Sequence, residues 1–306
     1  MAEPRLPKPP KPGKAMPRRF WSRSLGIRTT LFVAVSIVVV AVALAEMRRA
    51  PSAPDDDDGP ETPTHHLPFL ELGGTFMGLV VVSLVVLQRR ARRFNRENRE
   101  AIDLLRRGDL DGAGARFEAL RARRWPLQRH FTGIVSLNCG VVALRKGEFD
   151  RALSLFGAAL DAGVHGQVAQ LLAHQLTTLS ALRGDLDDAA GWLAQITSAP
   201  PPRVVEPALP EAILGCRRGE HRAVATRLEE SWREIDNSLQ GEAMRQLRIV
   251  RALAISAQGP REGGGVDGLL AGCKPFVMGE YDFLATQWPE MAMFLQAHVL
   301  SRGQAS

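Results

Sequence analysis

The stretch Gly147–Phe156, GEFDRALSLF, begins with a glycine that interrupts apolar residues at helical spacing. Similar phrases, each a glycine followed by an acidic residue, start at four other positions: Gly108 (GDLDGA), Gly184 (GDLDDA), Gly219 (GEHRAV) and Gly279 (GEYDFL). The first four of these glycines along the chain are 39, 37 and 35 residues apart. A period of this size is typical of stacked helix-turn-helix units, so the sequence predicts an all-α solenoid.

Each repeated phrase predicts the end of one helix and the start of the next. The glycine suits a left-handed helix end, and the acidic residue suits the positive N-terminal end of the following helix. A small residue follows five positions later, at Ala113, Ala152 and Ala189, and lets two helices approach closely. A bulky residue comes four positions further on, at Phe117, Phe156 and Leu193, and is expected to fill the space between units.

In this register the chain resembles the tetratricopeptide repeat (TPR) family, as a membrane-anchored bacterial member. The best-matching unit runs from Gly133 to about Gly163 and carries the signature residues Asn138, Gly140, Gly147, Phe149, Ala152, Phe156, Ala159 and Leu160. Weaker copies surround Gly108 and Gly184, and the copy at Gly219 has Val224 where a small residue is expected. The resemblance covers about residues 95–235. It implies a concave surface, lined mainly by the first helix of each unit, that binds a helix or an extended peptide of a partner protein.

The charge of the chain is concentrated at its N-terminus. Residues 1–28 hold eight Lys/Arg and one acidic residue, whereas the whole chain has 39 Lys+Arg against 33 Asp+Glu. The remainder is therefore almost neutral. This distribution argues against a general nucleic-acid-binding surface.

Two uncharged runs of 17 residues, Thr29–Ala45 and Leu72–Gln88, predict transmembrane helices over residues 27–46 and 69–88. Each run has a helical length of about 26 Å. That nearly matches a hydrocarbon core of about 30 Å once charged flanking side chains reach the interfaces. Alternatively, the first run is a signal peptide that is cleaved after Ala43–Ala45.

The flanking charges predict the orientation of both spans. Arginines precede the first run and follow the second at Arg89, Arg90, Arg92 and Arg93, whereas the linker 47–68 contains Asp55–Asp58. By the positive-inside tendency, both termini and the solenoid 89–306 lie in the cytoplasm, and the linker lies outside. We therefore expect a protein of the cytoplasmic (inner) membrane of a bacterium.

Two further motifs leave alternatives open. The Pro-rich basic tail, residues 1–26, contains Leu6–Lys14 (LPKPPKPGK), which favours polyproline II. It suits either a PxxP-binding groove or, by preference, anionic lipid headgroups. Gly74 and Gly78 have the GxxxG spacing that lets two membrane helices approach closely, within the hairpin or in a homodimer.

Signals of chemistry are weak. Cys139, Cys216 and Cys273 form no metal or disulfide pattern, and Asp55–Asp58 with His65 and His66 are expected to form a solvated loop. Gly263–Gly268 fits GxGxxG but follows no predicted strand. The sequence therefore predicts no enzyme, no metal and no cofactor. An active site near the Gly263–Gly268 loop remains the less favoured alternative.

The expected function is that of an adaptor or scaffold that recruits a partner protein to the membrane. Arg121, Arg123, Arg124 and Trp125 form a candidate partner contact, or else a solvated turn with Trp125 packed below it. Some TPR proteins grip a C-terminal carboxylate, but the matching positions here hold Asn98, Leu171 and Gln175, and only Asn138 fits. The alternative is a structural or regulatory subunit of a membrane complex that is assembled through the spans. The segment from Gly279 is expected to cap the solenoid.

Overall fold

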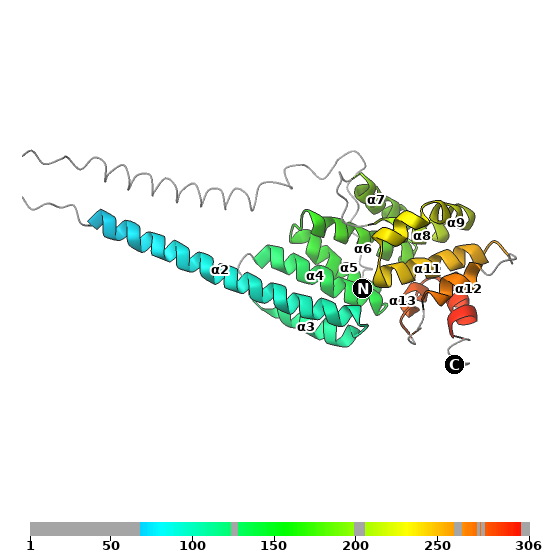
Figure 1. Cartoon of the computed structure of the whole chain (residues 1–306), viewed down its shortest axis with the longest axis horizontal. Coiled ribbons are helices and arrows are strands. Elements are labelled where there is room, and N and C mark those ends of the chain that lie inside the picture. The colour runs from blue at the N-terminus through cyan, green and yellow to red at the C-terminus, as the bar shows by residue number, and fades with distance from the viewer. Residues whose placement is uncertain are drawn as a thin grey trace, which may run out of the picture. The chain divides into compact units, whose positions relative to one another are not determined.

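The computed structural model describes residues 68–123, 128–198, 206–259, 265–273, 276 and 279–300. Every regular element in these ranges is helical and none is a strand, which confirms the all-α class (Figure 1). The first predicted span, residues 27–46, lies outside the described residues. The helices are α2 Pro68–Arg106, α3 Leu110–Ala122, α4 Gln128–Arg145, α5 Phe149–Asp161, α6 Gln167–Arg183, α7 Leu186–Thr197, α8 Ala208–Arg217, α9 His221–Glu230, α10 Trp232–Ser238, α11 Gly241–Ser256, α12 Gly265–Ala271, α13 Asp282–Ala285, α14 Pro289–Leu295 and the π-helix η2 Gln296–Leu300.

The chain divides into two units between Asn95 and Arg96, inside α2. In the first unit, α2 carries apolar side chains that are exposed by 38 to 60%: Val81, Val82, Leu84, Val85, Val86 and Leu87. Among the residues that the structure describes, no helix is long and apolar enough to cross a membrane.

The second unit is built from helices that pack against their neighbours in sequence. Helix α4 packs against α5, α6 against α7 and α8 against α9, while α6 also lies against α8. Gly108, Gly147, Gly184 and Gly219 have φ values of 84, 75, 89 and 77°, which confirms their predicted left-handed conformation. After each of them, the amide of the next residue donates to the carbonyl five residues earlier, as when Glu148 N donates to Ala143 O at 2.9 Å. This bond satisfies a carbonyl that the helix end would otherwise leave without a partner.

The small and bulky residues that the repeat predicts are mostly buried where they were expected. Ala113, Ala152 and Ala189 are fully buried, as are Phe117 and Phe156. In the third repeat, the one that follows Gly184, the prediction was wrong: Leu193 is only half-buried, and its neighbour Trp192 is the buried side chain. The larger indole removes more apolar surface from water, so it takes the interior position.

Two glycines in first helices allow close contact with the second helix. A Cβ atom on Gly140 would lie 2.4 Å from a ring carbon of Phe156, and one on Gly215 would lie 2.5 Å from a methyl group of Val224. In both pairs the glycine lies on the first helix and the larger side chain lies on the second. The valine that makes the fourth copy of the repeat irregular in sequence is therefore accommodated by the glycine opposite it.

The C-terminal segment, Gly279–Leu300, buries Trp288, Met291, Phe294 and Leu295, as the predicted cap requires, and leaves Met293 exposed. The guanidinium carbon of Arg217, at the end of α8, lies 5.8 Å from the centre of the Trp288 ring. Residues 265–268 of the predicted Gly263–Gly268 loop are helical, because α12 begins at Gly265. The apolar Leu270 of α12 is buried, and α12 packs against α11.

Candidate partner-binding surface

The first helices of the later units are enclosed rather than open. In α6 every residue from Leu172 to Leu182 except Gln175 is buried, and in α8 every residue from Ala208 to Cys216 except Glu211 is buried. Helix α11 packs against α8 and α9, and Trp288 lies against Arg217. The expectation of a concave surface that is open along the first helix of each unit was therefore wrong for α8. The chain's own C-terminal elements cover that helix.

A partly exposed row remains on the first helices of the earlier units. We call it the first-helix row. It consists of Asn98 and Ile102 on α2, Ile134, Asn138 and Val141 on α4, and Leu171 and Gln175 on α6. Within each helix these residues are three or four positions apart, so they share one helical face. Leu171 is 39% exposed, the largest exposure of a leucine in the described part of the repeats.

Carboxamide side chains occupy corresponding positions of this row. Asn138 and Gln175 each stand nine residues before the glycine that ends their helix, and Asn98 stands ten before its glycine. Asn138 Nδ2 donates to Asn98 Oδ1 at 2.9 Å, so the rows on α2 and α4 adjoin. The row contains no lysine or arginine that would pair with a terminal carboxylate. Its amides instead match the donors and acceptors of a peptide main chain, and its aliphatic neighbours suit apolar side chains.

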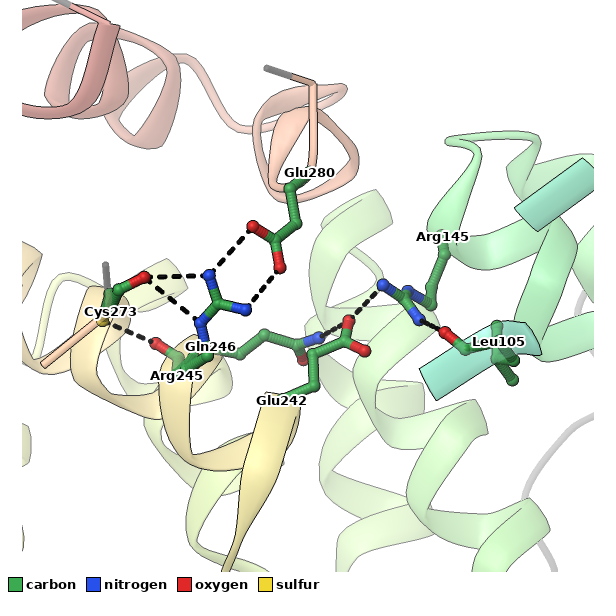
Figure 2. A network of polar contacts seen from close by, with 7 residues as sticks. All are labelled: Leu105, Arg145, Glu242, Arg245, Gln246, Cys273 and Glu280. Carbon is green, nitrogen blue, oxygen red and sulfur yellow. Dashed lines mark hydrogen bonds and ion pairs between the residues drawn. The ribbon is translucent and has the colours of Figure 1, made fainter. Parts of the chain in front are cut away.

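A polar network lies at the last turns of α2 and α4, and Figure 2 shows its residues. Arg145 donates to the carbonyl oxygen of Leu105 at 2.9 Å, and its other terminal nitrogen lies 2.6 Å from Glu242 Oε1. Gln246 donates to the same carboxylate oxygen at 2.9 Å. Burial raises the pKa of Glu242, and the charge of Arg145 opposes that rise. The network therefore joins the first two helix-turn-helix repeats to the start of α11.

The same network continues through Arg245 to the C-terminal segment. Arg245 contacts both carboxylate oxygens of Glu280, at 2.8 and 3.1 Å, and donates to the carbonyl of Cys273 at 2.8 and 3.2 Å. Its guanidinium carbon lies 5.7 Å from the centre of the Tyr281 ring. Paired, bidentate contacts of this kind fix geometry as well as adding stability. Helix α11 and the turn at Glu280 are thereby fastened to one another.

Basic residues just before the glycines link successive units. Arg145 and Arg217 each stand two residues before their glycine, and each donates to the carbonyl three residues before the preceding glycine. The second of these bonds joins Arg217 Nε to Ala181 O at 3.0 Å. We call such a bond an arginine rung. Sequence inspection missed it, although an arginine at this position of two units was a visible signal.

A second link joins the residue immediately before the glycine to an acid of the preceding unit. Lys146 lies 2.5 Å from Asp111, and Arg183 lies 2.9 Å from Asp150. Each aspartate stands three residues after its own glycine. The Lys146 amine lowers the pKa of Asp111 through a hydrogen bond and its charge. The acidic residues of the repeated phrase thus serve inter-unit pairing as well as the helix start.

The predicted basic contact is paired within the chain. Arg121 Nε lies 2.8 Å from Glu118, and Arg123 Nη1 lies 2.5 Å from Glu97. Arg124 and Trp125 lie outside the described residues. Of the predicted membrane flank, Arg89, Arg90, Arg92 and Arg93 are exposed on α2.

The candidates for chemistry do not come together among the described residues. The three cysteines are free and buried, and burial raises the pKa of Cys139 and Cys216 to about 12 and that of Cys273 to about 11. In the part of the chain that the structure covers, no group of three His, Cys, Asp or Glu residues is placed to hold a metal ion. Gly265 and Gly268 belong to α12 rather than to a loop, while Gly263 and Gly264 lie outside the described residues.

Asp55–Asp58 with His65 and His66, the other candidate metal ligands, also lie outside the described residues. Comparison of the chain with protein-family models, with curated proteins and with solved structures finds no match.

Proposed function

We propose that the protein is a membrane-anchored adaptor or scaffold, in which an array of TPR-like units binds a segment of a partner protein at the cytoplasmic face of a bacterial inner membrane. The observation that carries the proposal is the composition of α2, Pro68–Arg106. Its first part presents exposed aliphatic side chains, and from Arg96 onward it belongs to the unit that contains the repeats.

The anchoring part of the proposal rests on the run Leu72–Gln88, of which the structure describes the exposure of Gly78 and of residues 80–88. Val81, Val82, Leu84, Val85, Val86 and Leu87 are all exposed. Consecutive exposed positions point in all directions around a helix, and a helix that is apolar all round favours an apolar surrounding. The exposed arginines that follow at Arg89, Arg90, Arg92 and Arg93 favour a cytoplasmic location for the array.

The TPR-like assignment is supported by the 35 to 39 residue period and by the left-handed glycine at the end of each first helix. The first-helix row is the binding surface that we propose, because its amides and half-exposed aliphatic residues suit an uncharged, amphipathic peptide. No catalytic step is needed for this function. Membrane anchoring raises the effective concentration of the bound partner near other membrane proteins.

The test is recovery of cross-linked partners from membranes, with the full chain compared with a double variant, Ile134→Glu and Leu171→Lys. The two substitutions place charges in the row but leave the buried core intact, so we expect partner recovery to fall about tenfold or more while the amount of membrane-bound protein is unchanged. The matched control is Met293→Lys, since Met293 is 64% exposed on α14. Equal recovery from all three proteins would exclude the row as the binding surface.

The second candidate is a structural subunit that assembles through its membrane helices, including a homodimer through Gly74 and Gly78. Gly78 favours it, because this glycine is exposed and a Cβ atom there would meet nothing within 4 Å. Replacement of both spans by an unrelated hairpin separates the two functions. An adaptor still recovers its partner after this exchange, whereas a subunit assembled through the spans does not.

A further inference from the structure

A groove lies between α8, α9 and α10, with a volume of about 150 Å³. Its lining includes the buried apolar residues Ala212, Val224 and Leu228. Three carboxylates line it, those of Glu206, Glu211 and Glu234. The composition of the lining therefore suits a group that has an apolar stem and a positive charge.

The negative charge of the groove exceeds the positive charge beside it. Among the described residues that line the groove, the one basic residue is Arg227, whose side chain is 61% exposed and whose Nη1 lies 3.9 Å from Glu211. An exposed contact of that length contributes little free energy. Three carboxylates with one guanidinium give the described lining residues a net charge of −2.

The chain itself contains a segment with complementary charge. Leu6–Lys14 places Lys8, Lys11 and Lys14 at intervals of three residues, with prolines at most positions between them. Polyproline II has three residues per turn and a rise of about 3.1 Å, so the three lysines share one face at spacings of about 9 Å. These are three of the five lysines in the chain, which uses arginine for almost all its other positive charges.

We propose that the groove between α8, α9 and α10 binds the chain's own N-terminal segment Leu6–Lys14. Proline rings and lysine stems cover the apolar residues of the lining, and the ammonium groups pair with Glu206, Glu211 and Glu234. A segment that already favours polyproline II loses little conformational entropy on binding. The fourteen residues from Lys14 to Arg28 span up to about 45 Å, which gives the segment a long reach from the first predicted membrane run.

In the membrane this contact rests on the proposed orientation, in which the N-terminus and the repeats share one side. In neutral detergent micelles the contact does not depend on that orientation, because no bilayer separates the segment from the groove. The full chain in such micelles is treated with a carbodiimide, which joins an amine directly to a carboxylate in contact with it, and the linked peptides are identified by mass spectrometry. The pair Lys146 and Asp111, 2.5 Å apart, is an internal standard for the reaction.

We expect links from Lys8, Lys11 or Lys14 to Glu206, Glu211 or Glu234. In the variant Glu211→Gln with Glu234→Gln, the remaining link to Glu206 should fall about fivefold relative to the standard, since two exposed ion pairs are lost. The matched control, Glu229→Gln with Glu230→Gln on the exposed part of α9, should leave that link unchanged.

A variant with Lys11→Pro and Pro12→Lys keeps the composition and charge but breaks the three-residue spacing, so the links should weaken in it too. Absence of links in micelles, or equally strong links after this exchange, would overturn the proposal. So would protection of the lysines that needs phosphatidylglycerol vesicles and occurs without a link to the groove, because that result assigns the segment to the lipid surface. If no link forms in micelles, binding of the segment in the groove is excluded, but the proposed adaptor function is not. If the proposed membrane orientation is wrong, the links in micelles are still expected.

Discussion

Arg145 donates a hydrogen bond of 2.9 Å to the carbonyl oxygen of Leu105, a residue that precedes it by 40 positions. The carbonyl belongs to the last turn of α2 and also accepts from Gly108 N at 3.1 Å, so the guanidinium takes its second acceptor position. Arg217 repeats the relationship with Ala181 at 3.0 Å. Each arginine rung therefore completes the end of one helix with a side chain from the next unit, and so couples local helix stability to stacking.

Replacement of Arg145 by methionine should destabilise the protein by about 2–4 kcal/mol, because it leaves Glu242 with an unpaired charge in a largely buried site. The side chain of Arg145 is 9% exposed and that of Glu242 is 23% exposed. The measurement is the free energy of unfolding of the full chain in detergent, followed by tryptophan fluorescence.

Two further variants give this prediction its control. Arg116→Met removes an ion pair to Glu100 whose side chains are 54 and 48% exposed, and should change the free energy of unfolding by less than about 1 kcal/mol. Adding Glu242→Gln to Arg145→Met should restore part of the lost stability. If the two methionine variants unfold alike, the network of Figure 2 does not stabilise the fold.

Substitution of Gly140 by alanine should lower stability by about 1–3 kcal/mol, because the added Cβ would lie 2.4 Å from the Phe156 ring and force α4 and α5 apart. Gly157→Ala is the matched control, since a Cβ there meets nothing within 4 Å and the residue lies inside α5. That change should leave stability unchanged or raise it by about 0.5–1 kcal/mol. Paired thermal melts of the two variants decide the matter.

Much of the repeat architecture could be predicted from the sequence, because it depends on local rules. A glycine such as Gly147 marks a left-handed helix end, and an alanine such as Ala152 marks a close helix contact. Trp192 was not predicted in place of Leu193, since adjacent positions on a helix compete for the interior and only the packed structure decides between them. The compensation of Val224 by Gly215 was equally invisible, because it joins two helices.

The candidate surface was harder to predict than the fold, since it depends on what the C-terminal elements cover. The sequence shows where first helices begin and end, but not that α11 packs on α8 or that Trp288 lies against Arg217. Similarly, Arg121 and Arg123 read as a free basic patch until Glu118 and Glu97 are placed beside them. Contacts between residues far apart in the chain carry no local signal.

Acidification should destabilise the repeat array through His174. Burial lowers the pKa of this histidine from its ordinary 6.5 to about 4. Between these two values the unfolded chain binds a proton at this site and the folded chain does not. Stability is therefore full above about pH 6.5 and falls as the pH drops toward 4. Between about pH 7.5 and pH 5 the loss from His174 alone should be about 2 kcal/mol.

The variant His174→Gln should remove most of that pH dependence when unfolding in urea is compared at the two pH values. Burial also lowers the pKa of His130, whose neutral form is favoured further by His165, so a smaller dependence of the same sign should remain. Glu242 acts in the opposite direction, since its raised pKa favours the folded state as the pH falls. An unaltered pH dependence in His174→Gln would rule out this histidine as its source.

The three cysteines should react slowly with thiol reagents in the folded protein. With a pKa of about 12, only a fraction on the order of 10⁻⁴ of Cys139 and Cys216 is ionised to the thiolate at pH 8. Alkylation should therefore be about a thousandfold slower than for an ordinary thiol. Mass spectrometry after a timed alkylation pulse measures the rate. Rapid labelling of Cys139 before urea is added would contradict the packing of α4.

The bond between Arg145 and Glu242 also bears on how such a chain can change over time. Helix-pair arrays commonly grow or shrink by duplication or loss of a whole unit, because each unit touches only its neighbours. Here α11 returns to α4 across the intervening pair α6 and α7, so an inserted unit would separate partners now 2.6 Å apart. This ion pair therefore opposes the insertion or loss of a whole repeat, and variation is left to the exposed side chains.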